Sequence, residues 1–398
     1  MNSLFITALK VRFFANFYLL VSLSTVLLIS YTAEAQENSV THWGFSNVQE
    51  IWLANISNVS EDAEPVWLHY SDVSVGYDWS INNSWSLNMY GSAFYTNGNS
   101  ISALVGDLQG ISNIEADKGA AILELWVALE IPAGLRLKGG ILDSNADFDS
   151  IEPAQFFINS SQGIGPDLSS VGLNGPSIFP ETGLGAIAFI EKENWSLKLG
   201  TFDPLTRTSG SELNTARTVH WDWEDGLLVV SEAQITTTTS LITAGIWTSS
   251  FSLERSFPNL THLTNAKGIY TSLSRSNTFG DTYIRLGASE SKNAYFDRYF
   301  GAGWVKSISP NADLLPESRI GISWASARLG DLGIFTEFPS DQYTTNNHSY
   351  EHLLEISTST QLSDIIHLQP NLQLITHPGA QSSTPTRLVV GIRAALEI

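Results

Sequence analysis

The stretch LVVGIRAALEI at residues 388–398 decides the fold class. Apolar side chains occupy every second position from Leu388 to Ile398, while Gly391, Arg393 and Glu397 stand between them. A period of two places the two sets on opposite faces of a β-strand. The stretch is therefore predicted to be a strand with one apolar face and one polar face.

The same alternation recurs upstream, at residues 84–95, 121–131, 134–142, 194–202, 281–289 and 319–325. About fifteen candidate strands follow residue 70, separated by a mixture of short turns and longer Gly/Pro/Ser-rich connections. Transmembrane barrels combine short turns on one side with long loops on the other, and single-chain bacterial barrels have an even strand number. Residues 70–398 are therefore predicted to form an all-β, antiparallel transmembrane β-barrel of about sixteen strands.

The amino-acid composition excludes several classes of protein. The chain has 398 residues, a formal net charge of −20 and only 15% charged residues, against about 25% in a typical soluble protein. Its acidic balance argues against nucleic acid as a partner, because phosphates require a basic surface. The absence of cysteine excludes disulfides and thiolate metal sites. No apolar run long enough for a membrane-spanning helix follows residue 35. An outer-membrane barrel and a secreted or periplasmic all-β protein both remain open.

The N-terminus has the layout of an export signal. Lys10 and Arg12 precede an apolar run at residues 13–29, and Ala33 and Ala35 flank Glu34 at a small-residue cleavage site. Residues 1–35 are predicted to be a cleaved signal peptide, with an uncleaved anchor as the alternative. Residues 36–69 are expected to be irregular or to contain a short helix. With a barrel, such a signal indicates the bacterial outer membrane.

Several motifs resemble the carbohydrate-selective porin family called OprB. They follow one another in the family's order: LVGDLQGISNIEA at 104–116, ELW at 124–126, GGILD at 139–143 leading to DF at 147–148, FFINSSQG at 156–163, LQPNLQ at 368–373 with HPG at 377–379, and VGIR at 390–393. The resemblance implies an outer-membrane barrel that passes sugars, glucose among them, by diffusion, with no cofactor and no catalytic residue. Ile398, Asn371 and His377 depart from the family's usual Phe, Asp and Asn.

A sugar channel needs aromatic faces and hydrogen-bonding groups on its inner wall. The alternation turns the apolar residues of 121–131 and 134–142 outward, so the polar residues and Trp126 between them face inward. We expect sugar contact from six inward residues: Glu124, Trp126, Arg136, Lys138, Arg285 and Arg393. The alternative is a ladder of ion pairs on the wall, away from any constriction.

The connection at residues 144–173 is long for a turn. If it folds into the barrel and narrows the pore, four polar side chains would line the passage: Asn159, Ser160, Ser161 and Gln162. A loop that stays on the solvent side is the equal alternative.

Sequence motifs for a metal site or for catalysis are weak. The spacing from Asp143 to Asp149 resembles a calcium loop, but Phe148 and Ala154 stand where that loop requires Gly and Glu. We expect no metal, no cofactor and no enzymatic activity. Sugars as solutes and outer-membrane lipid are the expected partners, and the barrel could be a monomer or a homotrimer. Two alternatives stay open: a barrel for anions or other small solutes, and a secreted sugar-binding protein or glycosidase.

Overall fold

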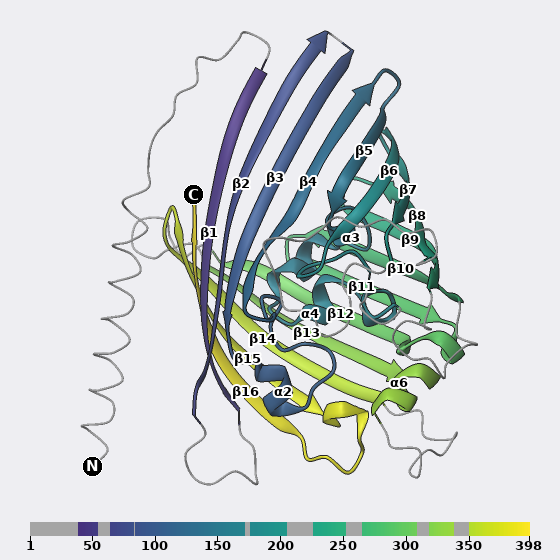
Figure 1. Ribbon diagram of the computed structural model, residues 1–398. Helices are drawn as coiled ribbons and strands as arrows, with labels where there is room; N and C mark the ends of the chain where they lie inside the picture. The colour runs from purple at the N-terminus through teal and green to yellow at the C-terminus, as the bar shows by residue number, and fades with distance from the viewer. Residues whose placement is uncertain are drawn as a thin grey trace.

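The computed structural model describes residues 39–54, 64–82, 84–171, 176–204, 226–251, 265–308, 318–337 and 350–398. Within these residues the chain forms a closed antiparallel barrel of sixteen strands, in which each strand pairs with the next and β16 pairs with β1 (Figure 1). The strands are β1 (Ser39–Ala54), β2 (Val66–Asn82), β3 (Trp85–Gly98), β4 (Gly119–Ile131), β5 (Leu135–Leu142), β6 (Gly183–Lys192), β7 (Trp195–Phe202), β8 (Gly226–Thr236), β9 (Ser240–Phe251), β10 (Asn265–Asn277), β11 (Gly280–Ser289), β12 (Phe296–Ile308), β13 (Ser318–Leu329), β14 (Tyr350–Ser363), β15 (Ile366–Thr376) and β16 (Arg387–Glu397). The predicted fold class and strand number are confirmed.

Short helices occupy the connections. They are α2 (Ile101–Val105), α3 (Ser144–Asp147), η2 (Glu152–Phe156), α4 (Ser160–Gly163), α5 (Pro166–Ser169), η4 (Ser291–Asn293), α6 (Asp331–Glu337) and η5 (Pro378–Ala380). Among the described residues, no helix combines the length and the apolar character needed to cross a membrane. The predicted turn between β4 and β5 is present, and Ala133 and Gly134 have φ of 73° and 74° there, the positive pair that a type I′ turn requires.

The outer face carries the apolar rows that the alternation predicts. Ile246, Ile269, Leu125 and Leu286 are 60, 58, 53 and 49% exposed in the isolated chain. Large apolar side chains are stable at this exposure when hydrocarbon covers them. Trp67 and Trp79, 40 and 41% exposed, lie twelve residues apart on the outer face of β2. Twelve residues at about 3.3 Å each and a tilt of about 45° span roughly 28 Å, close to the height of a barrel's apolar band.

The expectation for residues 36–69 is wrong. Residues 39–54 form the first barrel strand, and β2 already begins at Val66. Both faces of β1 mix polar and apolar side chains, since Glu50 faces inward between Val48 and Trp52 while Asn47 and Gln49 face outward. Because of this mixture, the sequence of β1 does not show the regular alternation of apolar and polar side chains that identifies the other strands. The predicted signal peptide at 1–35 lies outside the described residues, so it stays a prediction.

Two connections fold into the barrel interior (Figure 1). We call residues 99–118, between β3 and β4, the first inward segment, and residues 143–171, after β5, the second inward segment. Ile111 and Ile158 from the two segments pack with Trp52 and Leu353 of the wall. Phe148 of the second segment packs separately with residues of β7 to β10. The barrel therefore has an internal apolar core, built by these segments against strands around most of its wall.

Candidate functional site

Arg285 on β11 fixes the second inward segment to the wall. Its Nε and Nη2 donate to Asp149 at 2.7 and 2.6 Å, and its Nη1 donates to Asp167 at 2.5 Å. The rings of Tyr270 and Tyr299 lie 5.4 and 5.0 Å from the guanidinium, which is a cation–π distance. Arg285 is only 2% exposed. Burial raises the pKa of Asp149 to about 6, against the opposing effect of Arg285.

Other anchors carry the second inward segment across the interior. Lys138 on β5 donates to Asp147 at 2.8 Å, and Lys198 on β7 donates to the carbonyl of Asp147 at 2.6 Å. At the far side, Glu355 on β14 accepts from the backbone N–H of Ile158 at 2.8 Å. The segment thus bridges strands on opposite sides of the barrel, which shows that this connection folds inward.

The four predicted pore-loop residues lie in and beside α4, and they mainly contact the wall and the first inward segment. The Asn159 side chain donates to Gln373 at 3.2 Å and, as the N-cap of α4, accepts from the N–H of Ser161 at 3.0 Å. The Ser160 hydroxyl donates to the Ser112 carbonyl at 3.1 Å, and Gln162 accepts from Tyr283. Ser160 is half-buried, whereas Asn159, Ser161 and Gln162 are 1 to 3% exposed. Their contact with a solute stays a prediction.

Backbone donors hold the first inward segment to the rim of β14. Glu351 accepts from the N–H groups of Leu108 and Gln109 at 3.0 and 3.1 Å, and from Gly379 at 2.8 Å. Asp107 accepts from the N–H of Gly110 at 2.7 Å, and burial raises the pKa of Asp107 to about 6. This carboxylate closes the tight bend that directs the segment into the barrel.

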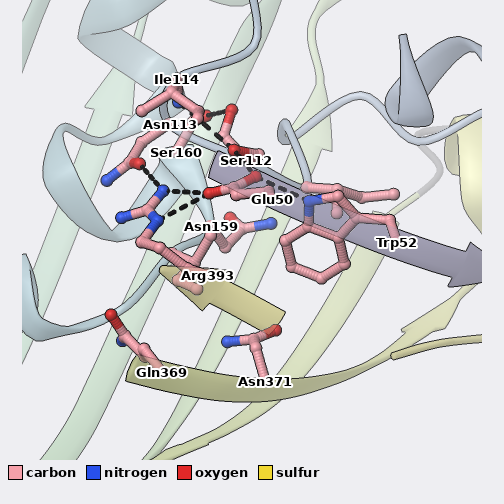
Figure 2. Close-up of polar contacts among 12 residues, drawn as sticks. Glu50, Trp52, Ser112, Asn113, Ile114, Asn159, Ser160, Gln369, Asn371 and Arg393 are labelled. Carbon is pink, nitrogen blue, oxygen red and sulfur yellow. Dashed lines mark hydrogen bonds and ion pairs between the residues drawn. The ribbon is translucent and has the colours of Figure 1, made fainter. Parts of the chain in front are cut away.

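The two inward segments meet β1 and β16 at a polar site (Figure 2). Arg393 on β16 donates through Nε to Glu50 on β1 at 2.6 Å and through Nη2 to the side-chain oxygen of Asn113. The second oxygen of Glu50 accepts from Trp52 at 2.6 Å and from Ser112 at 2.7 Å. Glu50 is fully buried, while Asn113 is exposed and Arg393 is half-buried. The buried Glu50 carboxylate therefore fixes the guanidinium of Arg393, and Arg393 and the Asn113 amide face solvent.

The separate motifs of the sequence converge on this site. Asn113 and Ser112 belong to the block at 104–116, Ser160 to 156–163, Gln369 to 368–373 and Arg393 to 390–393. Gln373 donates to the carbonyl of Ile111 at 2.8 Å, which joins two of these blocks directly. Residues more than 250 positions apart in the chain are thus neighbours in space.

A second group gathers on β4, β5 and β6. Lys138 lies 3.7 Å from Glu124, and its ammonium sits 4.4 Å from the centre of the Trp126 ring. Tyr90 stacks on Trp126 with ring centroids 5.4 Å apart. Because Lys138 and Tyr90 both pack on its rings, Trp126 has little open aromatic face, but its buried Nε1 has no hydrogen-bond partner among the described residues. Arg136 lies 4.8 Å over the ring of Phe189.

Solvent reaches only part of the inner wall. Inward side chains on β2–β5 and β16 are half-buried, namely Asp72, Tyr90, Trp126, Arg136 and Arg393. Five inward side chains on β11–β15 are buried beneath the inward segments, namely Arg285, Tyr299, Ser323, Glu355 and Gln373, whereas Arg319 on β13 is exposed and Gln369 on β15 is half-buried. The wall formed by β16 and β1–β5, which we call the open wall, therefore has a group of inward side chains that solvent can reach.

Of the six predicted contact residues, five lie on the open wall, where Lys138 is only 5% exposed, and Arg285 does not. The sequence prediction missed Glu50, because residues 36–69 were expected to be irregular, and Asn113, which comes from a loop without alternation. It also missed Arg319, an exposed inward residue of β13 whose guanidinium lies 4.8 Å over the Phe156 ring. Among the described residues, no group of three or more His, Cys, Asp or Glu could hold a metal ion.

Comparisons with known proteins agree with this architecture. A family model described as carbohydrate-selective porin, OprB family, matches residues 243–397. A high-pH structure of Pseudomonas putida OprB is similar with a TM-score of 0.69 and 13% identity, covering 90% of this chain and 94% of that chain. Salmonella typhi OmpF in complex with daunomycin gives a TM-score of 0.58 at 8% identity, over 90% and 97% of the two chains.

Vibrio cholerae OmpT in its trimer form gives a TM-score of 0.56 at 9% identity, over 91% of this chain and 100% of that chain. A search of curated proteins finds no match to the sequence. The structural similarities show that the barrel has the porin fold.

Proposed function

We propose that this chain is an outer-membrane channel of the carbohydrate-selective porin family, OprB, whose model matches residues 243–397, and that its solutes are small sugars of the glucose type that cross by passive diffusion. The observation that carries the proposal is the convergence of the family's motifs on the Arg393–Glu50–Asn113 site. The site combines donors and acceptors, which suits hydroxyl groups that both donate and accept.

Arg393 is the central contact of the proposed sugar path. Its Nε and Nη2 bond to Glu50 and Asn113, which leaves the Nη1 donors for a hydroxyl group. The exposed amide nitrogen of Asn113 supplies further donors (Figure 2). Nearby, Gln369 supplies its carbonyl oxygen as an acceptor, since its amide nitrogen donates to Phe156 and Ser357. Such contacts replace part of the water shell of a sugar without holding it tightly, and diffusion through a channel requires weak binding.

Glu124, Trp126, Arg136 and Lys138 form a second contact region on the same open wall. Trp126 is half-buried, with Lys138 and Tyr90 packed on its rings and its Nε1 buried, so only part of its ring edge remains for a solute. Arg285 contributes indirectly by positioning the second inward segment.

Charge pairing favours neutral solutes over anions. Arg285 is paired with Asp149 and Asp167, and Lys138 lies within ion-pair distance of Asp147 and Glu124. Arg393 is paired with Glu50. These cations are neutralised by carboxylates, so they do not form the single-sign field that would concentrate anions.

Localisation follows from the same proposal. The protein is inserted into the outer membrane after export and removal of residues 1–35, and lipid covers the apolar outer rows. The trimer form of Vibrio cholerae OmpT supports an oligomeric assembly for this chain as well.

Liposome swelling with purified protein tests the function. The solutes are a monosaccharide, a disaccharide and a trisaccharide, each against a neutral non-sugar of matched size. The proposal predicts faster entry of the monosaccharide than of its size-matched partner and a steep fall with sugar length. Equal rates within every matched pair would leave a general pore without carbohydrate selectivity.

A further inference from the structure

Two arginines lie side by side on the outer face of the barrel. Arg298 on β12 and Arg328 on β13 are direct cross-strand partners. Their chain neighbours Tyr299 and Ala327 point inward and are buried, so the alternation along a strand turns both arginines outward. Like charges placed directly opposite each other destabilise a sheet. Such a pair is favourable where an anion lies between the two side chains.

A single buried carboxylate offsets part of this charge. Asp297, where a β-bulge interrupts the pairing of β12 with β13, accepts from Nε and Nη2 of Arg328 at 2.7 Å each. Arg298 is exposed, and its Nη1 donates to the backbone carbonyls of Ser289 and Asp297 at 3.3 and 2.7 Å. Its Nε and Nη2 have no hydrogen-bond partner among the described residues. Arg298 is therefore held in place with free donors and without a carboxylate partner in this part of the chain.

Aromatic side chains of β14 complete the site. The guanidinium of Arg328 lies 5.9 Å from the centre of the Tyr350 ring, a cation–π distance. His352 stacks on Tyr350 with ring centroids 5.8 Å apart, and its Nδ1 lies 2.9 Å from the Ser326 hydroxyl, which leaves Nε2 for another partner. We call Arg298, Arg328, Tyr350 and His352 the outer basic site.

The site lies at the extracellular edge of the apolar outer face. Porin-type barrels have short turns on the periplasmic side and longer loops outside. Residues 364–365 form the short turn at one end of β14, and the site lies at the other end, which follows the connection 330–349. Along β12, Lys306 is the next outward basic residue, eight positions from Arg298. Eight residues at about 3.3 Å each and a tilt of about 45° span roughly 19 Å, so these two cations bracket the membrane-facing part of the strand.

Basic residues at the extracellular end gather on one sector of the barrel. Lys267 on β10 and Lys292 in η4 are exposed at this end. Their acidic neighbours are Glu290, 4.0 Å from Lys267, and Asp331, which accepts from the Ser291 hydroxyl at 3.2 Å. At the same end of β1–β3 the outward positions include no Lys or Arg, namely Ile51, Leu53, Trp67, His69 and Tyr95. The positive charge is therefore a local feature of β10–β13.

On the premise that the protein is inserted in the outer membrane, as proposed above, we propose that the outer basic site binds a phosphate group of an acylated, phosphorylated glycolipid in the outer leaflet. Guanidinium groups bind phosphate oxygens through paired, charge-assisted hydrogen bonds. A phosphate between Arg298 and Arg328 also removes the repulsion between the two cations. The acyl chains then lie on the apolar side chains below the site, among them Phe300 and Trp324, which are 38 and 41% exposed.

The position of the site favours a lipid over a soluble anion. The site faces away from the lumen, so a solute that crosses the channel does not meet it. Cationic side chains at the membrane surface attract lipid phosphates, and aromatic side chains such as Tyr350 and Trp324 are typical of the same level of the membrane. A lipid satisfies both the charged edge and the apolar surface beneath it.

Lipid binding to the purified protein in neutral detergent tests the site, with native mass spectrometry counting the bound molecules. The probes are lipid A with two phosphates, the same lipid after removal of its phosphates, and the deacylated phosphorylated disaccharide. We expect the phosphorylated lipid to bind at least tenfold more tightly than either other probe. Equal affinity with and without phosphates would contradict the proposal, and equally tight binding of the deacylated probe would show a site for soluble anions instead.

Arg298→Gln locates the binding, and Lys306→Gln at the opposite edge of β12 is the matched control. We expect Arg298→Gln to weaken binding of phosphorylated lipid A at least fivefold and Lys306→Gln to leave it unchanged. Glucose entry into liposomes should be unchanged in both variants, because both side chains lie outside the lumen. Equal losses of lipid binding in the two variants would show attraction by overall charge and overturn the site.

A double variant tests the second arginine without leaving a buried charge unpaired. Arg328→Gln with Asp297→Asn removes the cation together with its carboxylate, and we expect lipid binding to fall at least fivefold again. Unchanged binding would exclude Arg328 from the site and overturn the paired-arginine proposal. A natural channel without carbohydrate selectivity in the liposome assay would instead refute the proposed function and leave the lipid measurement standing.

Discussion

Replacing Arg285 by Met removes the central anchor of the second inward segment. The variant leaves Asp149 and Asp167 buried without their cation, and each is now 2% exposed. Breaking a buried ion pair from one side costs about 3 to 5 kcal/mol, a factor of about 10² to 4 × 10³ in an equilibrium constant. The remaining anchors, among them Lys138 and Glu355, still hold the segment at Asp147 and Ile158.

We therefore expect the barrel to persist while the segment detaches from the wall at Asp149 and Asp167 and the channel widens. In liposome swelling, the entry rate of a trisaccharide relative to a monosaccharide should rise at least fivefold. Adding Asp149→Asn and Asp167→Asn to Arg285→Met removes the unpaired charges and should restore most of the size limit. Leu286→Met, outward on the same strand, is the matched control.

The reasoning would be refuted by an Arg285→Met channel whose size limit equals that of the natural protein. That result would mean either that the ion cluster does not hold the segment or that the segment does not limit solute size. A widened channel that the two Asn replacements fail to narrow would show that the packing of the arginine, rather than its charge, is the anchor.

Three further predictions address individual groups. Asp107 has a pKa raised from 3.8 to about 6, so the folded protein binds more protons than the unfolded chain between about pH 4 and 6, and its free energy of unfolding falls as the pH rises through that window, by up to about 3 kcal/mol from this group. Urea unfolding followed by Trp fluorescence should show this slope, and Asp107→Asn should reduce it while Asp149, whose pKa is also raised to about 6, keeps part of it; identical slopes would contradict the assignment. Trp126→Ala removes the ring on which Lys138 and Tyr90 pack, and loss of an aromatic contact of about 0.5 to 1.5 kcal/mol should lower glucose entry roughly two- to tenfold; an unchanged rate would remove Trp126 from the sugar path. Glu50→Ala leaves Arg393, Trp52 and Ser112 without their acceptor and should lower the free energy of unfolding by about 3 to 5 kcal/mol; a loss below about 1 kcal/mol in the same urea assay would show that the site is not built on Glu50.

The barrel could be predicted from the sequence because its signal is local. Each strand from β2 onward shows its apolar outer row within ten or so residues, and turns such as Ala133–Gly134 mark the ends. The alternation is not visible in β1, where Glu50 serves the inner site and the outward side chains of Asn47 and Gln49 are polar. The alternation also assigned Leu123 to the outer face incorrectly, because a β-bulge interrupts the pairing of β3 with β4. The bulge turns Ile122 outward, where it is 39% exposed, and leaves Leu123 half-buried.

The site could be predicted only in part. Alternation along the strands correctly placed Glu124, Lys138 and Arg393 on the inner face. Which of these a solute can reach depends on contacts between distant residues, such as Arg285 with Asp149, 136 positions apart. Asn113 lies on a loop whose position depends on Glu351 and Gln373 far along the chain, so no local pattern predicts it.

Ion current through a single reconstituted channel, recorded as glucose is added, tests the role of the Arg393 site most directly. A sugar that occupies the constriction obstructs ions, so the account predicts a saturable decrease of the current in the natural protein. Joint replacement by Arg393→Met and Glu50→Gln, which leaves no unpaired charge, should keep the open-channel current but weaken the glucose effect at least tenfold. The same saturable decrease in both proteins would contradict the placement of the sugar path at this site.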